Sequence, residues 1–178
     1  MEFSELLEKR RSIRSYDASK RVTKEQVEEL VNAAIQAPSW KNSQTARYYV
    51  ILDENRADEF AAKCLPEFNA NNCKGAALII TSFVMNRSGF ERDGSPSNEA
   101  GNGWGFYDLG LHNENLILKA TELGLSTLVM GIRDEKSIRD FIQVPDTETI
   151  VSVIAVGYSD ATPDKPKRKS TEDIVKFI

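Results

Sequence analysis

The pattern of apolar and polar residues along the chain predicts both helices and strands. A capping-box pattern, TKEQ at residues 23–26, opens a helix whose apolar residues recur at helical spacing. We expect that helix to end at Pro38, because a proline disfavours the α conformation of the residue before it. Further helices are expected over residues 3–10, 55–63, 104–123 and 134–142.

Continuous apolar runs rich in β-branched residues predict four strands, at residues 48–52, 77–84, 126–131 and 150–158. The last run is apolar throughout, which is typical of a central strand. Residues 86–103 carry Gly, Ser, Asn and Pro without periodicity and predict a long loop, often a functional lid or a disordered segment. Since helices and strands are mixed without strict alternation, the pattern favours an α+β fold in one domain, residues 1–178.

The C-terminal segment, SDATPDKPKRKSTEDIVKFI, is a polar, proline-containing arm with an apolar end. An apolar end needs a surface to pack against. It either returns to the sheet of its own chain or crosses to a partner subunit.

Composition narrows the class of protein. The 178 residues carry a net charge of −4 with 40% hydrophobic residues, an ordinary profile for a globular protein. The acidic balance argues against nucleic acid as the main partner, since phosphate-backbone binding needs a broad basic face. No apolar run is long enough to span a membrane and no signal-peptide core is visible, so we expect a cytoplasmic protein with reduced cysteines. One histidine, His112, argues against a histidine metal site, and no metal is expected.

The stretch KRRSIRSYD places four cations, Lys9, Arg10, Arg11 and Arg14, within six positions of this acidic chain. Arginine side chains match phosphate geometry with two hydrogen bonds, and Ser12 can add a neutral one. The cluster therefore suits a small phosphate-bearing ligand. The alternative is a solvated positive end of the first helix, which the helix dipole favours in any case.

Other polar groups are compatible with ligand binding without requiring it. The tail cations Lys165, Lys167, Arg168 and Lys169 can join the same phosphate or merely solubilise the arm. The loop APSWKNSQ, residues 37–44, suits the polar edge of a heteroaromatic ligand, or serves only as a connection. Asp108 and His112, four residues apart on a helix, form a pair that is usually structural. The common dinucleotide, P-loop and CxxC signatures are absent.

Taken in order, RRSIR, APSWKNSQ, YDLGLHNENLILKATELGLST and KSTEDIV resemble the nitroreductase family of FMN-dependent oxidoreductases over nearly the whole chain. The resemblance implies an α+β, nitroreductase-like fold with a central, mainly antiparallel sheet flanked by helices. It also implies a homodimer that exchanges its C-terminal arms and binds FMN in two clefts at the subunit interface.

The resemblance assigns cofactor-binding roles to residues of this chain. Arg10 and Ser12, with Arg11 beside them, are expected at the FMN phosphate and ribityl chain, and Arg14 at the pyrimidine edge. Lys74, with Asn71 beside it, is expected as the second cation at the pyrimidine edge, and the backbone of Met130 and Gly131 is expected beside flavin N5. The other expected contacts are the tail cations Lys167, Arg168 and Lys169, and the loop residues Pro38, Ser39 and Asn42 from the other subunit.

The implied activity is ping-pong transfer of hydride from NAD(P)H through FMN to an aromatic acceptor such as a nitro compound or quinone. No catalytic side chain is expected, because the flavin carries the chemistry. Trp40, Phe90 and Trp104 are expected to shape the acceptor pocket, although all three suit packing equally well. Two alternatives are a same-fold flavin enzyme with another substrate and a non-catalytic flavin or nucleotide-phosphate binding protein. The second is favoured by Thr45-Ala46, where family loops continue with Pro-Trp.

Overall fold

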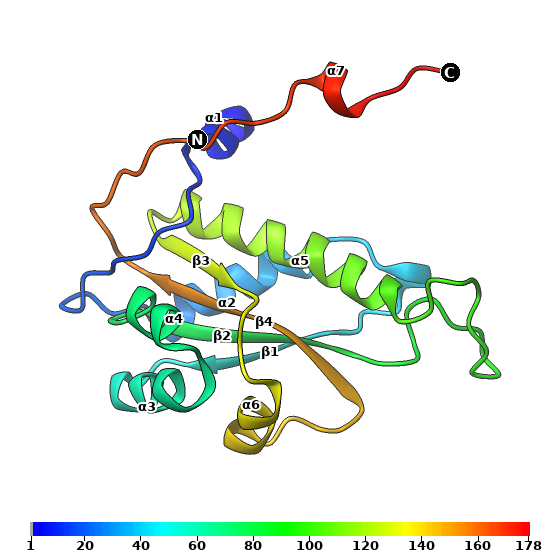
Figure 1. The fold of residues 1–178 in the computed structure, drawn as a ribbon, viewed down its shortest axis with the longest axis horizontal. Helices are drawn as coiled ribbons and strands as arrows, with labels where there is room; N and C mark the ends of the chain where they lie inside the picture. Colours follow the sequence, from blue (N-terminus) through cyan, green and yellow to red (C-terminus); the bar gives the residue numbers. More distant parts are fainter. Residues whose placement is uncertain (1) are drawn as a thin grey trace.

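The computed structural model describes residues 2–178 and contains one four-stranded sheet flanked by helices on both faces (Figure 1). The strand order is β1-β2-β4-β3, and all three neighbouring pairs are antiparallel. The strands are β1 (Ala46–Ile51), β2 (Ala77–Val84), β3 (Ser126–Met130) and β4 (Glu148–Gly157). The expected antiparallel sheet and the interior position of the fourth strand are therefore confirmed.

Seven α-helices and one 3₁₀ turn are assigned within the described residues. They are α1 (Phe3–Lys9), α2 (Lys24–Ala34), the turn η1 (Trp40–Asn42), α3 (Glu54–Cys64), α4 (Glu67–Asn72), α5 (Gly103–Glu122), α6 (Glu135–Ile142) and α7 (Thr171–Ile174).

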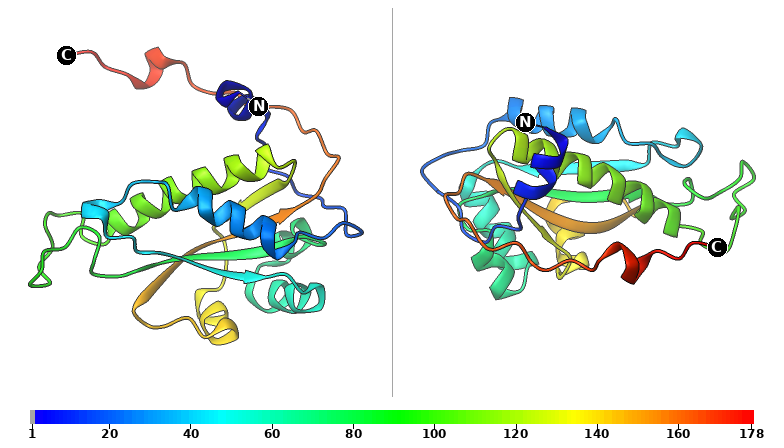
Figure 2. Two further views of the ribbon diagram at one scale, coloured as in Figure 1. Left: turned by 180° about the vertical axis from the view of Figure 1, so that it is seen from behind. Right: turned by 90° about the horizontal axis from the view of Figure 1, so that it is seen from above.

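Two apolar cores lie on opposite faces of the sheet. Helices α2 and α5 cover one face, where Leu30 and Leu116 are fully buried against residues of β2 and β4. Helices α3, α4 and α6 cover the other face, where Phe60 and Ile138 are fully buried (Figures 1 and 2). Because both faces are covered, β2 and β4 are apolar along most of their length, which explains why their sequences read as continuous apolar runs.

Helix boundaries largely follow the sequence prediction, with two differences. Helix α2 ends at Ala34, and tighter turns continue to Ala37, directly before Pro38. The proline therefore ends these turns, but it does not directly follow the α-helix. Helices α4 and α7 were not predicted, because each is six residues or fewer and too short to show apolar periodicity.

The segment of residues 10–17, here called the strap, crosses from α1 over the start of β3 to the end of β4. Ser12 forms a parallel bridge with Thr127, and the Asp17 amide donates to the Tyr158 carbonyl over 2.8 Å. The C-terminal segment, residues 161–178, is exposed throughout and runs past α1 and away from the sheet (Figures 1 and 2). It does not return to the sheet of its own chain.

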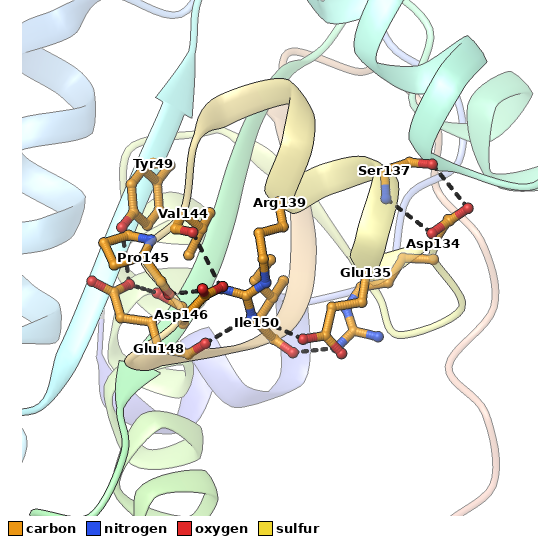
Figure 3. A network of polar contacts seen from close by, with 12 residues as sticks. Tyr49, Asp134, Glu135, Ser137, Arg139, Val144, Pro145, Asp146, Glu148 and Ile150 are labelled. Atoms are coloured by element: carbon orange, nitrogen blue, oxygen red, sulfur yellow. Dashed lines mark hydrogen bonds and ion pairs between the residues drawn. The ribbon is translucent and has the colours of Figure 1, made fainter.

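A buried polar network fixes α6 to the start of β4 (Figure 3). The Glu148 carboxylate is 6% exposed and accepts hydrogen bonds from the Tyr49 hydroxyl over 2.9 Å and the Ser82 hydroxyl over 2.5 Å. Burial, and next the Glu148 carboxylate, raise the pKa of Tyr49 to about 12. Arg139 of α6 donates to the backbone carbonyl of Glu148 over 2.9 Å.

Among the helices of residues 2–178, none combines the length and apolar character needed to cross a bilayer.

Candidate functional site

The strap holds its arginines at the surface by anchoring the residue between them. Ile13 is 5% exposed, and its amide donates to the Thr127 carbonyl over 2.9 Å. Side chains alternate along an extended segment, so Ser12 and Arg14 face away from the core and are exposed. The RRSIR pattern thus combines one buried apolar anchor with polar groups available to a ligand.

The three arginines of the strap differ in their partners. The guanidinium of Arg11 donates to the backbone carbonyls of Glu8 and Arg10, each over 2.7 Å, and so caps the end of α1. Arg14 makes only a long hydrogen bond of 3.3 Å to the Ser12 carbonyl. Arg11 therefore has a structural role, whereas the guanidiniums of Arg10 and Arg14 retain most of their donors.

The strap packs against the end of α4, which carries Asn71, and against the segment between α4 and β2, which carries Lys74. The Tyr16 ring is half-buried, and desolvation raises the pKa of Tyr16, with nearby Cys73 raising it further. Gly75 has φ +83°, and a Cβ at this position would lie 3.1 Å from the Ala18 Cβ, so a glycine permits the close approach. Arg14 and Lys74 consequently lie on segments in direct contact with each other.

Helix α4 also contacts the segment that follows β3. The Asn69 side-chain amide is 6% exposed and donates to the Ile132 carbonyl over 2.9 Å. Asn71 follows Asn69 by two residues, and Met130 and Gly131 directly precede Ile132. The strap, the end of α4 and the end of β3 therefore form one continuous region, which we call the cationic face.

The cations of this region are free of carboxylate partners. Within residues 2–178, ion pairs of 4.0 Å or less involve none of the seven cations Arg10, Arg11, Arg14, Lys74, Lys167, Arg168 and Lys169. Cations without carboxylate partners, beside a hydroxyl, form the donor set that a phosphate requires. The residues present therefore fit a phosphate-bearing cofactor such as FMN.

The basic tail reaches the same end of the molecule as the strap. The Lys165 ammonium contacts the Glu8 carboxylate of α1, and this hydrogen bond is the main cause of the lowered pKa of Glu8. Between the strap, the turn after α5 and residues 159–163 lies a cavity of about 490 Å³. Lys9, Arg10 and Arg11 line one side of it. The basic clusters from the two ends of the sequence thus meet in the fold.

The loop of residues 37–44 lies at the opposite end of α5 from the strap (Figure 1). The Trp40 amide donates to the Asp108 carboxylate over 2.9 Å, whereas Thr121 lines the cavity beside the strap. Asp108 and Thr121 are thirteen positions apart on the helix, about 20 Å at 1.5 Å per residue. One chain therefore does not bring Pro38, Ser39 and Asn42 to the cationic face.

The three residues expected in an acceptor pocket lie together at this second end. The Trp40 and Trp104 rings pack against each other with centroids 4.5 Å apart, and Tyr107 packs edge-on against Trp104 at 5.6 Å. Phe90 lies on the loop of residues 86–102, where it is half-buried and bridges to Pro96. This loop is held by its own hydrogen bonds, so the structure supports an ordered loop and not a disordered segment.

Asp108 contributes to this end of the molecule in a way that the sequence did not reveal. The spacing of Asp108 and His112 predicts a pair within the helix, yet the carboxylate accepts hydrogen bonds from Trp40 and Ser88. Both partners are distant in the sequence, so spacing along α5 carries no signal for them. Burial lowers the pKa of His112, and within residues 2–178 its Nδ1 has no hydrogen-bond partner.

Comparison with known proteins identifies the family. The model of the nitroreductase family matches residues 7–158. A relative from Archaeoglobus fulgidus, provisionally named NADH dehydrogenase/NAD(P)H nitroreductase, is 24% identical over 153 residues, covering 84% of this chain and 80% of that protein.

Solved structures share the fold across the whole chain. A nitroreductase family protein from Clostridium difficile is 25% identical with a TM-score of 0.79, covering 99% of this chain and 98% of that one. A structure from Desulfovibrio desulfuricans, provisionally named a nitroreductase and solved in complex with FMN, is 23% identical with a TM-score of 0.73, covering 98% and 95% of the two chains. The expected α+β fold is thus confirmed, and the chain belongs to the nitroreductase family.

Proposed function

We propose that this protein is an FMN-dependent oxidoreductase that passes hydride from NAD(P)H to an aromatic acceptor by a ping-pong mechanism. The observation that carries the proposal is the cationic face, where Arg10, Arg14 and Lys74 lack carboxylate partners within residues 2–178 and lie on the strap, which bridges to β3, or on the segment that packs against the strap. The FMN complex of the relative from Desulfovibrio desulfuricans supports the choice of cofactor.

Different residues of the cationic face bind different parts of FMN. Arg10 and Ser12 hold the phosphate and the ribityl chain, and the tail cations Lys167, Arg168 and Lys169 close over the phosphate from the side that Lys165 already reaches. Arg11 supports the phosphate-binding residues indirectly, by holding the end of α1 in place. Asn71 hydrogen-bonds the polar edge of the ring system.

Bound FMN would supply the hydride chemistry at its N5 atom. Arg14 and Lys74 would stabilise the negative charge that accompanies reduction of the flavin, because two fixed cations at the pyrimidine edge favour the charged form. The backbone of Met130 and Gly131 would hold the N5 side of the ring system. The protein needs no nucleophile or acid–base pair of its own for this reaction.

The site requires a second copy of the chain, and we propose a homodimer with exchanged C-terminal arms. Pro38, Ser39 and Asn42 lie at the end of α5 that is far from the cationic face of their own chain, and they complete the site of the partner subunit. The exposed apolar end of the arm, which includes Phe177 at 91% exposure, packs on the partner subunit.

An exposed stripe of α5 provides further support for the dimer. Phe106 and Tyr107 are 48% and 59% exposed, and a Cβ at Gly110, one turn later, would meet nothing within 4 Å among residues 2–178. An interior helical glycine costs about 1 kcal/mol relative to alanine, so its presence without a neighbour in its own chain favours close approach by a second subunit.

The aromatic acceptor binds where the partner's loop meets the flavin. Trp40 and Trp104, in contact with each other, and Phe90 on the neighbouring loop form an aromatic surface suited to stacking on a quinone or nitroaromatic ring. Nicotinamide and acceptor occupy this place in turn.

Steady-state kinetics test the proposal. The purified protein with added FMN is assayed by varying NADH or NADPH against a simple quinone, and parallel double-reciprocal lines are expected. Bound FMN with no turnover from either nicotinamide would contradict the enzymatic function and favour a flavin-binding protein. An intersecting pattern would contradict the ping-pong order.

A further inference from the structure

The loop of residues 37–44 has a backbone conformation that must be held in place. Lys41, Asn42 and Gln44 have φ values of 47°, 54° and 50°, in the left-handed region that residues other than glycine adopt at a cost. Three such residues within four positions do not persist in a free loop. The surrounding structure therefore has to stabilise this conformation.

The buried contacts that stabilise the loop converge on one carboxylate. Asp108 is 4% exposed, and its Oδ2 accepts hydrogen bonds from the Trp40 amide over 2.9 Å and from the Ser88 hydroxyl. Ser88 in turn contacts the Ser43 hydroxyl over 3.0 Å, so the loop is tied to Asp108 at Trp40 directly and at Ser43 through Ser88. Two further ties, an ion pair of 2.9 Å between Lys41 and Glu91 and a hydrogen bond of 3.1 Å from Arg47 to the Gln44 carbonyl, are exposed and contribute little.

We propose that Asp108 is a positioning residue for the flavin site, which fixes the loop of residues 37–44 in the shape that Pro38, Ser39 and Asn42 present to the FMN of the partner subunit. This inference rests on the proposed function. A carboxylate suits the task because it only accepts hydrogen bonds, and one oxygen can take both an amide and a hydroxyl. Within residues 2–178 no Lys or Arg pairs with Asp108, so these donors are what satisfy its buried charge.

The chain provides a specific signal for the loop and a matched control. Its two tryptophans, Trp40 of the loop and Trp104 of α5, are packed against each other at this site, so tryptophan fluorescence reports on the packing of the loop against α5. Glu148 is the control residue, because it is a similarly buried carboxylate that also accepts from a serine hydroxyl and one further donor. It lies in the network between β4 and α6 (Figure 3), and within residues 2–178 no side-chain hydrogen bond joins Tyr49, Ser82 or Glu148 to the loop of residues 37–44.

The experiment compares Asp108→Ala, Ser88→Ala and Glu148→Ala with the wild-type dimer. We expect Asp108→Ala to shift the tryptophan emission to longer wavelength and to raise the Kd for FMN at least tenfold, and Ser88→Ala to do both to a smaller extent. Glu148→Ala should lose thermal stability while keeping the wild-type emission and a Kd within twofold of wild type. If Asp108→Ala does not fold, Ser88→Ala and Glu148→Ala make the same comparison.

Two outcomes overturn the inference. Unchanged emission in both variants would mean that Asp108 and Ser88 do not hold the loop. A shifted emission with an unchanged Kd for FMN would mean that the loop is not part of the flavin site. A wild-type protein that binds no FMN is a distinguishable result, since it refutes the proposed function and the flavin role of the loop together, whatever the emission shows.

Discussion

Gly105 in the first turns of α5 is the position at which one added methyl group should have the clearest effect. A Cβ there would lie 2.3 Å from two carbons of the Phe83 ring, which is itself 1% exposed and packs edge-on against Phe106 at 4.9 Å. Neither the ring nor the strand that carries it has space to retreat, so Gly105→Ala must push the start of α5 outward. Overpacking of this kind costs about 1–3 kcal/mol, and the better helix propensity of alanine returns up to about 1 kcal/mol.

So close an overlap places the overpacking cost in the upper part of its range, about 2–3 kcal/mol, and the expected net loss is therefore about 1–2 kcal/mol, a fall in Tm of roughly 2–8 °C for a chain of this size. Thermal unfolding followed by circular dichroism, at one fixed protein concentration, measures it. Gly103→Ala is the matched control, because its Cβ would meet only the Ala100 Cβ at an ordinary 3.6 Å. Its Tm should not fall. A Gly105→Ala protein as stable as wild type would refute the close packing of α5 on β2.

The remaining predictions concern the site and the titrating groups. Arg14→Ala should weaken FMN binding by about 1.5–3 kcal/mol, roughly tenfold to a hundredfold in Kd by fluorescence titration; an unchanged Kd would remove Arg14 from the site. Deleting the exposed residues 161–178 should leave the fold intact by circular dichroism but yield a monomer on sizing. Burial raises the pKa of Cys64 and Cys73 to about 11, so a thiol reagent at pH 8 should label neither until the protein unfolds. Burial lowers the pKa of His112 from 6.5, so the unfolded chain binds the proton more tightly than the folded chain. The free energy of unfolding should therefore fall as the pH drops below about 6.5. The variant His112→Gln should lose that pH dependence, as measured by urea unfolding.

The secondary structure was largely readable from the sequence because each long element buries at least one of its sides. The strand at residues 77–84 is apolar because helices cover both faces of the sheet. The helix from Gly103 to Glu122 repeats its buried residues at helical spacing. Helix α4 lacked this signal: it is six residues long, its single buried residue is Asn69, and Phe68 is 53% exposed.

The candidate site was less readable, because it depends on contacts between distant segments. The basic strap was visible as a charge cluster, but the capping role of Arg11 depends on the end of a helix. The hydrogen bond between Trp40 and Asp108 joins residues 68 positions apart, and no local pattern encodes it. The order of the loop at residues 86–102 likewise follows from hydrogen bonds within the loop and to Lys41 and Ser43, which glycine and serine content alone does not indicate.

The most direct test of the central claim is the absorption spectrum of the purified protein, recorded before and after anaerobic addition of NADH and then NADPH. The proposed function predicts a yellow protein, or one that becomes yellow with FMN, whose flavin bands bleach with at least one nicotinamide. A colourless protein that takes up no added FMN would contradict it, and the unpaired cations of the strap would then be ordinary surface charges.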